Sequence, residues 1–214
     1  HMVGAKCQDL RKWNYFANGV DAANTLFDNL LTEPYAAFDF VGKNTDNGYS
    51  VWASNVIYNE TMKKYVMYFC TTSSYVKSTL CFATADNIEG PYTYVDTILY
   101  SGYGKSNISE TNLYDVLGKN ADISRYLEYG GYNNKEWPNC IDPAIFTDAD
   151  GRMWMNYGSW SGGIFLLEID PTTGYPIYPV DDKDADPYYG YRLIGGGHHS
   201  AEGPYIQYLS LIHI

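Results

Sequence analysis

The sequence is poor in basic residues and has no long apolar run. Lysine and arginine together number 14, against 25 aspartate and glutamate residues, so the formal net charge is −11 at pH 7. A chain this negative is repelled by the phosphate backbone of nucleic acids and by anionic membrane surfaces. No stretch reaches the roughly 18 consecutive apolar residues that a membrane-spanning helix needs. We therefore expect neither nucleic acid nor a membrane as a partner.

Cysteine is scarce, and its spacing matches no metal site. The four residues Cys7, Cys70, Cys81 and Cys140 lack the short paired spacings of zinc-binding motifs. Cys70 and Cys81 fall in two β-rich runs, residues 65–72 and 78–85, which read as a hairpin. The two thiols could face each other across it and form a disulfide, or both could be buried free thiols. The sequence leaves both alternatives open and predicts no metal site.

Helical periodicity is missing as well, while aromatic residues are abundant. The chain carries 23 tyrosine, 8 phenylalanine and 5 tryptophan residues in short runs separated by turn residues. Such side chains suit pleated surfaces, and their amphipathic rings also suit stacking on sugars. At 214 residues the chain forms one domain or part of one. We predict an all-β fold, in which the polar inserts 21–47 and 101–135 are loops over one face.

One stretch reads clearly as a β-hairpin with a carboxylate at its entrance. Asp142 and a proline precede an apolar run at residues 144–146, and turn residues follow at 148–151. A second strand, Met153–Tyr157, completes the hairpin. A carboxylate at the start of a buried strand costs desolvation free energy unless something satisfies or uses it. This position is therefore a candidate functional site.

The start of this hairpin recurs elsewhere in the chain. Residues 52–57 align with residues 141–146, and a third copy begins at residues 201–206. Repeated units of several short strands are typical of a β-propeller, in which each unit's innermost strand begins near the central axis. The aligned position is Ala53 in the first copy, Asp142 in the second and Glu202 in the third. The alignment thus predicts two carboxylates at the same place in neighbouring units.

These motifs resemble glycoside hydrolase family 43, most closely its endo-α-1,5-L-arabinanases. The similarity runs from about residue 1 to residue 208 and is carried by WASNVIYNETMKKYVMYF, CIDPAIF, GSWSG and LIGGGHHSAEGPYI. The resemblance implies a five-bladed β-propeller, of which this chain supplies about three blades, from part of blade 1 to part of blade 4. Residues 1–214 would then be a partial catalytic domain. Residues 209–214 depart from the family pattern, and we expect them not to continue it.

The resemblance also implies roles for particular residues. The family hydrolyses glycosidic bonds with inversion, using three carboxylates. By motif, Glu202 matches the general acid and Asp142 matches the carboxylate that orients this acid and tunes its pKa. The Asp that acts as general base belongs to a strand before His1, so we expect it outside this chain.

Five further residues are candidates for binding the substrate. Trp52 and Trp160 flank the inner strands, where each could be a platform for a sugar ring or part of the core. Ser159 and Ser161 could offer hydrogen bonds to sugar hydroxyls, and Asn139 precedes the blade-three motif.

Two other clusters contain histidine or acidic side chains, but we expect structural roles for them. His198 and His199 lie just before the third copy, where packing of the loop is favoured over catalysis. The acidic run 181–186 lacks the spacing of a calcium-binding loop and is expected to be solvated. No cofactor is certain. A structural calcium ion, often held on the axis of arabinanases, would need residues outside this chain.

The resulting hypothesis is a glycosidase that cleaves α-1,5-linked L-arabinan. Its partner would be plant cell-wall polysaccharide, namely the arabinan side chains of pectin, and its location extracellular or at the cell surface. The chain by itself is expected to be inactive without its base. A propeller that binds such glycans without cutting them is one alternative. An exo-acting β-xylosidase or α-L-arabinofuranosidase on the same fold is another.

Overall fold

A computed structural model describes residues 3–18 and 36–207 of the chain, and this part is almost entirely β-structure. Within it, the one α-helix is the short α1 (Leu113–Leu117), and 3-10 turns occur at Ala36–Phe38, Ile108–Glu110 and Ser124–Tyr126. No helix in the described ranges is long and apolar enough to cross a membrane. The prediction of an all-β fold is confirmed.

Four antiparallel strands form the first large sheet, in the order β3-β4-β5-β6. They are β3 (Ser50–Asn59), β4 (Lys64–Ser74), β5 (Lys77–Ala85) and β6 (Thr93–Ser101). β4 and β5 form the predicted hairpin, in which Cys70 pairs with Leu80 and Cys81 pairs with Phe69. The two cysteines are not directly opposite each other, and both are buried free thiols. Of the two alternatives, the free thiols are confirmed.

The second large sheet grows from the predicted hairpin at Asp142. Its central strands are β9 (Ala144–Thr147), β10 (Met153–Tyr157) and β11 (Ile164–Ile169), which pair in that order. The short strands β12 (Pro176–Ile177) and β13 (Tyr191–Ile194) both pair with β11. The turn from β9 to β10 forms as expected, because the Asp148 carboxylate accepts hydrogen bonds from the backbone of Asp150 and Arg152.

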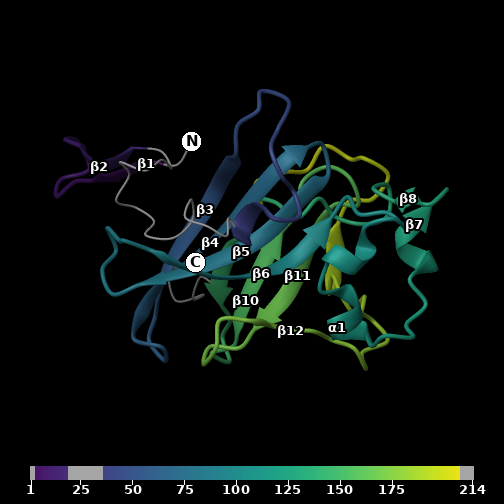
Figure 1. Cartoon of the computed structure of the whole chain (residues 1–214). Helices are drawn as coiled ribbons and strands as arrows, with labels where there is room; N and C mark the ends of the chain where they lie inside the picture. The colour runs from purple at the N-terminus through teal and green to yellow at the C-terminus, as the bar shows by residue number, and fades with distance from the viewer. Residues whose placement is uncertain (1–2, 19–35, 208–214) are drawn as a thin grey trace.

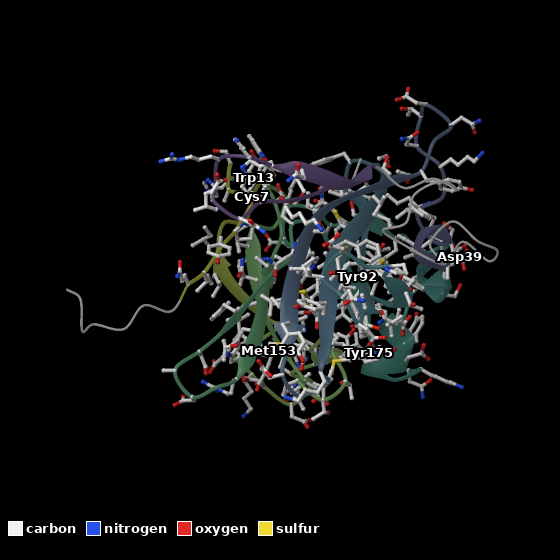
Figure 2. All side chains as sticks on the ribbon, turned by 90° about the vertical axis from the view of Figure 1, so that its left-hand side faces the viewer. Cys7, Trp13, Asp39, Tyr92, Met153 and Tyr175 are labelled. Carbon is white, nitrogen blue, oxygen red and sulfur yellow. The ribbon has the colours of Figure 1, made fainter. Side chains whose placement is uncertain are left out.

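Smaller elements surround the two sheets. The ladder of β1 (Val3–Lys6) and β2 (Asn14–Asn18) lies at one edge of the molecule, opposite α1 and the ladder of β7 (Leu127–Glu128) and β8 (Gly131–Tyr132) (Figure 1). Figure 2 shows Cys7 and Trp13, both between β1 and β2, at the molecular periphery. The insert 101–135 was predicted as a loop, but it contains α1, the 3-10 turns at Ile108–Glu110 and Ser124–Tyr126, and the β7–β8 ladder. Most of the insert 21–47, and residues 209–214, lie outside the described residues.

Tyrosine fills the space between the two sheets. Tyr188 and Tyr189, which precede β13, are fully buried, and their hydroxyls reach across to the first sheet and its following segment. Tyr189 donates to the carbonyl of Tyr100 in β6, and Tyr188 donates to Asn112. Buried tyrosines with paired hydroxyls add apolar area without leaving an unsatisfied polar group. Much of the tyrosine excess therefore serves the core.

The acidic run 181–186 differs from its prediction at its last residue. Asp186 is only 7 % exposed, and its carboxylate accepts hydrogen bonds from Tyr126 and from the backbone of Tyr188 and Tyr189. Arg125 forms an ion pair with it at 3.2 Å. Burial raises the pKa of Asp186 despite these partners. The run is a solvated loop only in part, because its end anchors the core through a carboxylate that the sequence pattern did not distinguish.

The alignment of the inner strands has a counterpart in the backbone. Ala53 has φ 49° and Asp142 has φ 55°, so the aligned residues share a left-handed conformation that few non-glycine residues adopt. The strand β3, which contains Ala53, is joined directly to β9, which follows Asp142. The side-chain oxygen of Asn55 in β3 accepts a hydrogen bond from the N–H of Ile145 in β9 at 3.0 Å. The first two copies of the repeat are structurally equivalent.

The third copy departs from the prediction. Residues 201–207 form no strand, and the left-handed residue is Gly203 (φ 59°), one position after Glu202. A strand needs a neighbouring strand to satisfy its backbone groups, and none in the described part of the chain pairs with this segment. Its position is set instead by contacts with the second sheet.

Candidate functional site

Asp142 lies where the chain enters β9, and its backbone conformation is demanding. At φ 55° most L-residues are strained, whereas Asp and Asn are among those that tolerate this region best. The next residue, Pro143, is buried, so the chain cannot relax outwards at this point. The side chain is partly buried, and the N–H of Gly203 donates a hydrogen bond to its carboxylate. The segment that carries Glu202 is thereby held against Asp142.

The connection between β10 and β11 forms the second part of the site. Two of its residues, Trp160 and Ser161, adopt left-handed conformations with φ 46° and 39°. From one side, Gly158 and Gly162 donate backbone hydrogen bonds to Ile141 and Trp137, just before Asp142. Strained backbone of this kind persists only where surrounding contacts fix it, and it is common at functional sites.

The other side of the same connection holds the segment that carries Glu202. The N–H of Trp160 donates to the carbonyl of Ala201 at 2.7 Å, and the N–H of His198 donates to the carbonyl of Ser161 at 3.0 Å. The indole N–H of Trp160 donates to Oε2 of Glu202 at 3.1 Å. Glu202 is solvent-exposed, so its carboxyl group is fixed in direction yet open to a ligand.

The charge of Glu202 acts on Asp142. Burial raises the pKa of Asp142, the hydrogen bond from Gly203 opposes that rise, and the charge of Glu202 adds to it. The two residues lie near each other as predicted, but their place at the entrances of neighbouring units stays a prediction, because the segment of Glu202 forms no strand. Paired carboxyls in unequal environments are the arrangement that acid–base chemistry uses.

Tyr75 completes this group from the first sheet. It lies in the turn between β4 and β5, is 59 % exposed, and contacts Ser161 through its hydroxyl at 3.0 Å. The same hydroxyl is 3.3 Å from Nδ1 of His198. His198 has φ 63°, so a third left-handed residue lies beside the two in the β10–β11 connection. The packing role predicted for His198 agrees with these contacts, whereas Tyr75 was not predicted.

Trp52 approaches Asp142 from the first sheet. Its carbonyl accepts a hydrogen bond from the buried thiol of Cys70 at 3.4 Å, and the same sulfur lies against the backbone N–H of Asp142. Its indole is 38 % exposed and donates to the hydroxyl of Thr72 at 3.2 Å. Trp160 is 43 % exposed. Both predicted platforms are therefore partly open to solvent.

The other three predicted contacts are covered. Ser159 and Ser161 are buried, and Ser161 is engaged with Tyr75. Asn139 is 6 % exposed and lies 3.5 Å from the hydroxyl of Ser101, which also accepts from the N–H of Cys140. The structure brings Asp142, Glu202 and Trp160 together, and it links Trp52 to Asp142 through the buried Cys70 thiol.

The described part of the chain contains no cluster of metal-binding side chains. In residues 3–18 and 36–207, no group of three or more His, Cys, Asp or Glu side chains converges on a point where an ion could bind.

Comparison with known proteins relates this surface to a class of enzymes. No family model matches the chain. The chain is 34 % identical over 208 residues to an extracellular endo-α-(1→5)-L-arabinanase of Thermotoga petrophila, and 34 % identical over 208 residues to the extracellular endo-α-(1→5)-L-arabinanase 2 of Bacillus subtilis. Each alignment covers 97 % of this chain, but only 39 % and 38 % of the respective relatives.

A solved structure agrees with these relatives. A glycoside hydrolase family 43 protein from Bacillus licheniformis superposes with a TM-score of 0.75 at 33 % identity, covering 97 % of this chain and 40 % of that protein. The chain is homologous to glycoside hydrolase family 43. The resemblance predicted from the motifs is confirmed, and the chain spans about 40 % of the length of these family 43 relatives.

Sequence reasoning missed two parts of this family 43 site. Tyr75 stands at a hairpin turn in Ser-Ser-Tyr-Val-Lys, where an aromatic residue carries no signal of a contact 86 positions away. The N–H of Gly203 was missed because the third copy was aligned as a strand start. A turn reading of Gly203-Pro204 would have predicted a free backbone donor beside Glu202.

Proposed function

We propose that this chain is part of a glycosidase that hydrolyses α-1,5-linked L-arabinan. The observation that carries the proposal is the pairing of the partly buried Asp142 with the exposed Glu202, whose carboxylate is held by the half-exposed indole of Trp160. The relatives named endo-α-(1→5)-L-arabinanases support the choice of substrate. The protein would then act on the arabinan side chains of plant pectin, outside the cell as its extracellular relatives do.

Glu202 is assigned the role of general acid. An acid must present a proton to the oxygen of the leaving sugar, so it has to be accessible and fixed in direction. The bond from Trp160 holds one carboxylate oxygen, which leaves the other to face the substrate. Asp142 is kept in the orienting and tuning role that the resemblance assigned, and its hydrogen bond from Gly203 supports this role by fixing the backbone beside Glu202.

Inversion needs a third carboxylate to activate water on the opposite side of the sugar ring, roughly 6.5–9.5 Å from the acid. We propose, as the resemblance to the family implied, that the base belongs to a segment outside these 214 residues.

We further propose that the two large sheets are blades of a five-bladed propeller. The first is an antiparallel meander of four strands, which is the form of a propeller blade, and the second contains a four-strand antiparallel path with β13 as a fifth strand. Each has a left-handed residue at its first strand, Ala53 within β3 and Asp142 two residues before β9. In this architecture the inner strands converge on the axis, and the carboxyl pair lies at the entrance of adjacent blades.

The test is the release of reducing sugar from linear α-1,5-arabinan. It compares the 214-residue chain with a version extended at both ends to the length of its relatives. We expect turnover only from the extended version, because only it would contain the base and a complete set of blades. Binding of arabino-oligosaccharides by the extended version without any hydrolysis would overturn the enzyme and favour a binding module. Release of single pentoses from chain ends would favour an exo-acting glycosidase.

A further inference from the structure

A cavity of about 640 Å³ is lined by Trp52 but by neither residue of the carboxyl pair. Its walls come from the start of β3, the end of β4 and the turn that precedes β3, through Asn44, Asp46, Tyr49, Ser50, Trp52 and Thr72. Cavities that bind small molecules usually measure about 300–1,000 Å³ and combine aromatic walls with a few polar groups. This cavity has both features, and no role has been assigned to it above.

The turn that forms one wall is rigid before any ligand arrives. Oδ1 of Asn44 accepts hydrogen bonds from the N–H groups of Asp46 and Gly48, at 3.0 and 2.9 Å. The amide nitrogen of the same side chain donates to the hydroxyl of Ser50 at 2.8 Å, which ties the turn to β3. A wall fixed in advance loses little conformational entropy on binding.

Two aromatic rings face this space. Tyr49 is 37 % exposed and Trp52 is 38 % exposed. Phe38 packs against Tyr49 with ring centroids 4.8 Å apart, and Thr72 accepts the indole N–H of Trp52, so neither ring is loose. Partly exposed aromatic rings held in place by their neighbours suit the C–H surfaces of sugars.

Hydrogen-bonding capacity remains in the polar walls. The hydroxyls of Ser50 and Thr72 each accept a bond, from Asn44 and Trp52, so each still has its proton to donate. The exposed Asp46 carboxylate has no partner within residues 3–18 and 36–207, and it can only accept while ionised. Lys43 lies over the Tyr49 ring at 5.5 Å, so one positive and one negative group flank the cavity. A neutral ligand rich in hydroxyl groups fits donors, acceptors and charge together.

Trp52 relates the cavity to the candidate active site. Trp52 lines the cavity, and its carbonyl accepts from the buried Cys70 thiol, against which the N–H of Asp142 lies. A polymer that extends from the carboxyl pair over Trp52 would reach the cavity.

We propose that this cavity is a remote subsite for the polysaccharide, which binds a furanosyl unit of the chain away from the bond being cleaved. The inference rests on the proposed function and adds to it. Contacts with Tyr49 and Asp46 would then raise the affinity for long arabinan chains above that for short ones. Internal cleavage of a polymer requires binding contacts on both sides of the scissile bond, and this cavity would provide those on the Trp52 side.

The test measures binding of linear α-1,5-arabino-oligosaccharides of increasing length by calorimetry. The protein is the complete gene product that contains these residues, with Glu202→Gln to prevent hydrolysis. Tyr49→Ala and Asp46→Ala are compared with Tyr58→Ala, which removes another exposed tyrosine of β3 at its far end. Asp46→Ala is the safer variant for folding, because its carboxylate contacts no other described side chain. Thermal unfolding checks that each variant is folded.

We expect the gain in affinity with chain length to shrink about tenfold in Tyr49→Ala, and about threefold in Asp46→Ala, but to persist in Tyr58→Ala. A second outcome is that the gain in affinity with chain length persists in all three variants while Trp160→Ala weakens the binding of oligosaccharides of every length. In that case the cavity is not a subsite, although the proposed function stands. If xylo-oligosaccharides show the same gain, the ligand class is wrong. If the parent protein binds no arabino-oligosaccharide, the proposed function and the subsite both fail.

Discussion

Replacing Asp142 by Asn should separate the contribution of this carboxylate to catalysis from its effect on the stability of the folded protein. Burial and the charge of Glu202 raise the pKa of Asp142 above its ordinary value of 3.8, so the folded protein favours the protonated form. The associated stability is fully present below about pH 3.8 and is lost as pH rises through the pKa in the folded state. Near neutral pH the ionised group therefore destabilises the fold.

Asn removes that charge and keeps the geometry. It tolerates the left-handed backbone at φ 55°, and its Oδ1 can still accept from the N–H of Gly203. Ala has neither advantage, and a left-handed non-glycine residue costs roughly 1–2 kcal/mol. For a chain of this length each kcal/mol corresponds to about 2–4 °C in Tm. Asp142→Ala should thus melt about 2–8 °C below Asp142→Asn.

The assay is thermal unfolding between pH 3 and pH 8, with arabinan hydrolysis measured in parallel on the extended protein. Asp142→Asn should be more stable than the parent at pH 7, equal to it at about pH 3, and nearly inactive. An Asn variant that is less stable than the parent at pH 7 would refute the electrostatic reasoning. A variant that retains full activity would refute the assignment of Asp142 to the site.

Three other changes probe the supports of the site. Tyr75→Phe removes a hydroxyl that contacts Ser161. The kcat should fall by roughly two- to twelvefold, which corresponds to the loss of one hydrogen bond, while Tm stays unchanged. An unchanged kcat would show that Tyr75 does not position the site. Gly162→Ala places a Cβ 2.5 Å from the Glu136 carbonyl oxygen and should lower the unfolding free energy in urea by about 1–3 kcal/mol, whereas Gly131→Ala, with its nearest atom at 3.8 Å, should cost less than half of that. Asp186→Ala leaves buried tyrosine groups without their acceptor and should lower Tm by about 6–12 °C, corresponding to about 3 kcal/mol; a change below 2 °C would contradict its anchoring role.

Local patterns predicted the two sheets well. The hairpin at Asp142 follows from apolar runs separated by Asp and Gly residues, and the strand Met153–Tyr157 forms with the predicted bounds. The repeat alignment placed Asp142 and Ala53 at equivalent positions, and their shared backbone conformation bears this out. Periodicity and turn chemistry act over a few residues, so a sequence reveals them directly.

Contacts between distant segments could not be predicted in the same way. The hydroxyl of Tyr75 meets Ser161 and His198 because a turn of the first sheet reaches the second. Asp186 looked like one more member of an acidic run until the fold placed Tyr126 and Arg125 around it. Glu202 was assigned to the site by motif and lies near Asp142, but its backbone does not begin a strand, because pairing depends on a neighbour that local sequence does not specify.

Glu202→Gln in the extended protein tests the central claim most directly. The substitution keeps size and leaves an oxygen that can accept from the Trp160 indole, but it removes the proton donor. General acid catalysis is typically worth about 10²–10⁴-fold, so reducing-sugar release from linear arabinan should fall by that factor, with binding of arabino-oligosaccharides retained. Hydrolysis by the Gln variant at the rate of the parent protein would contradict the account.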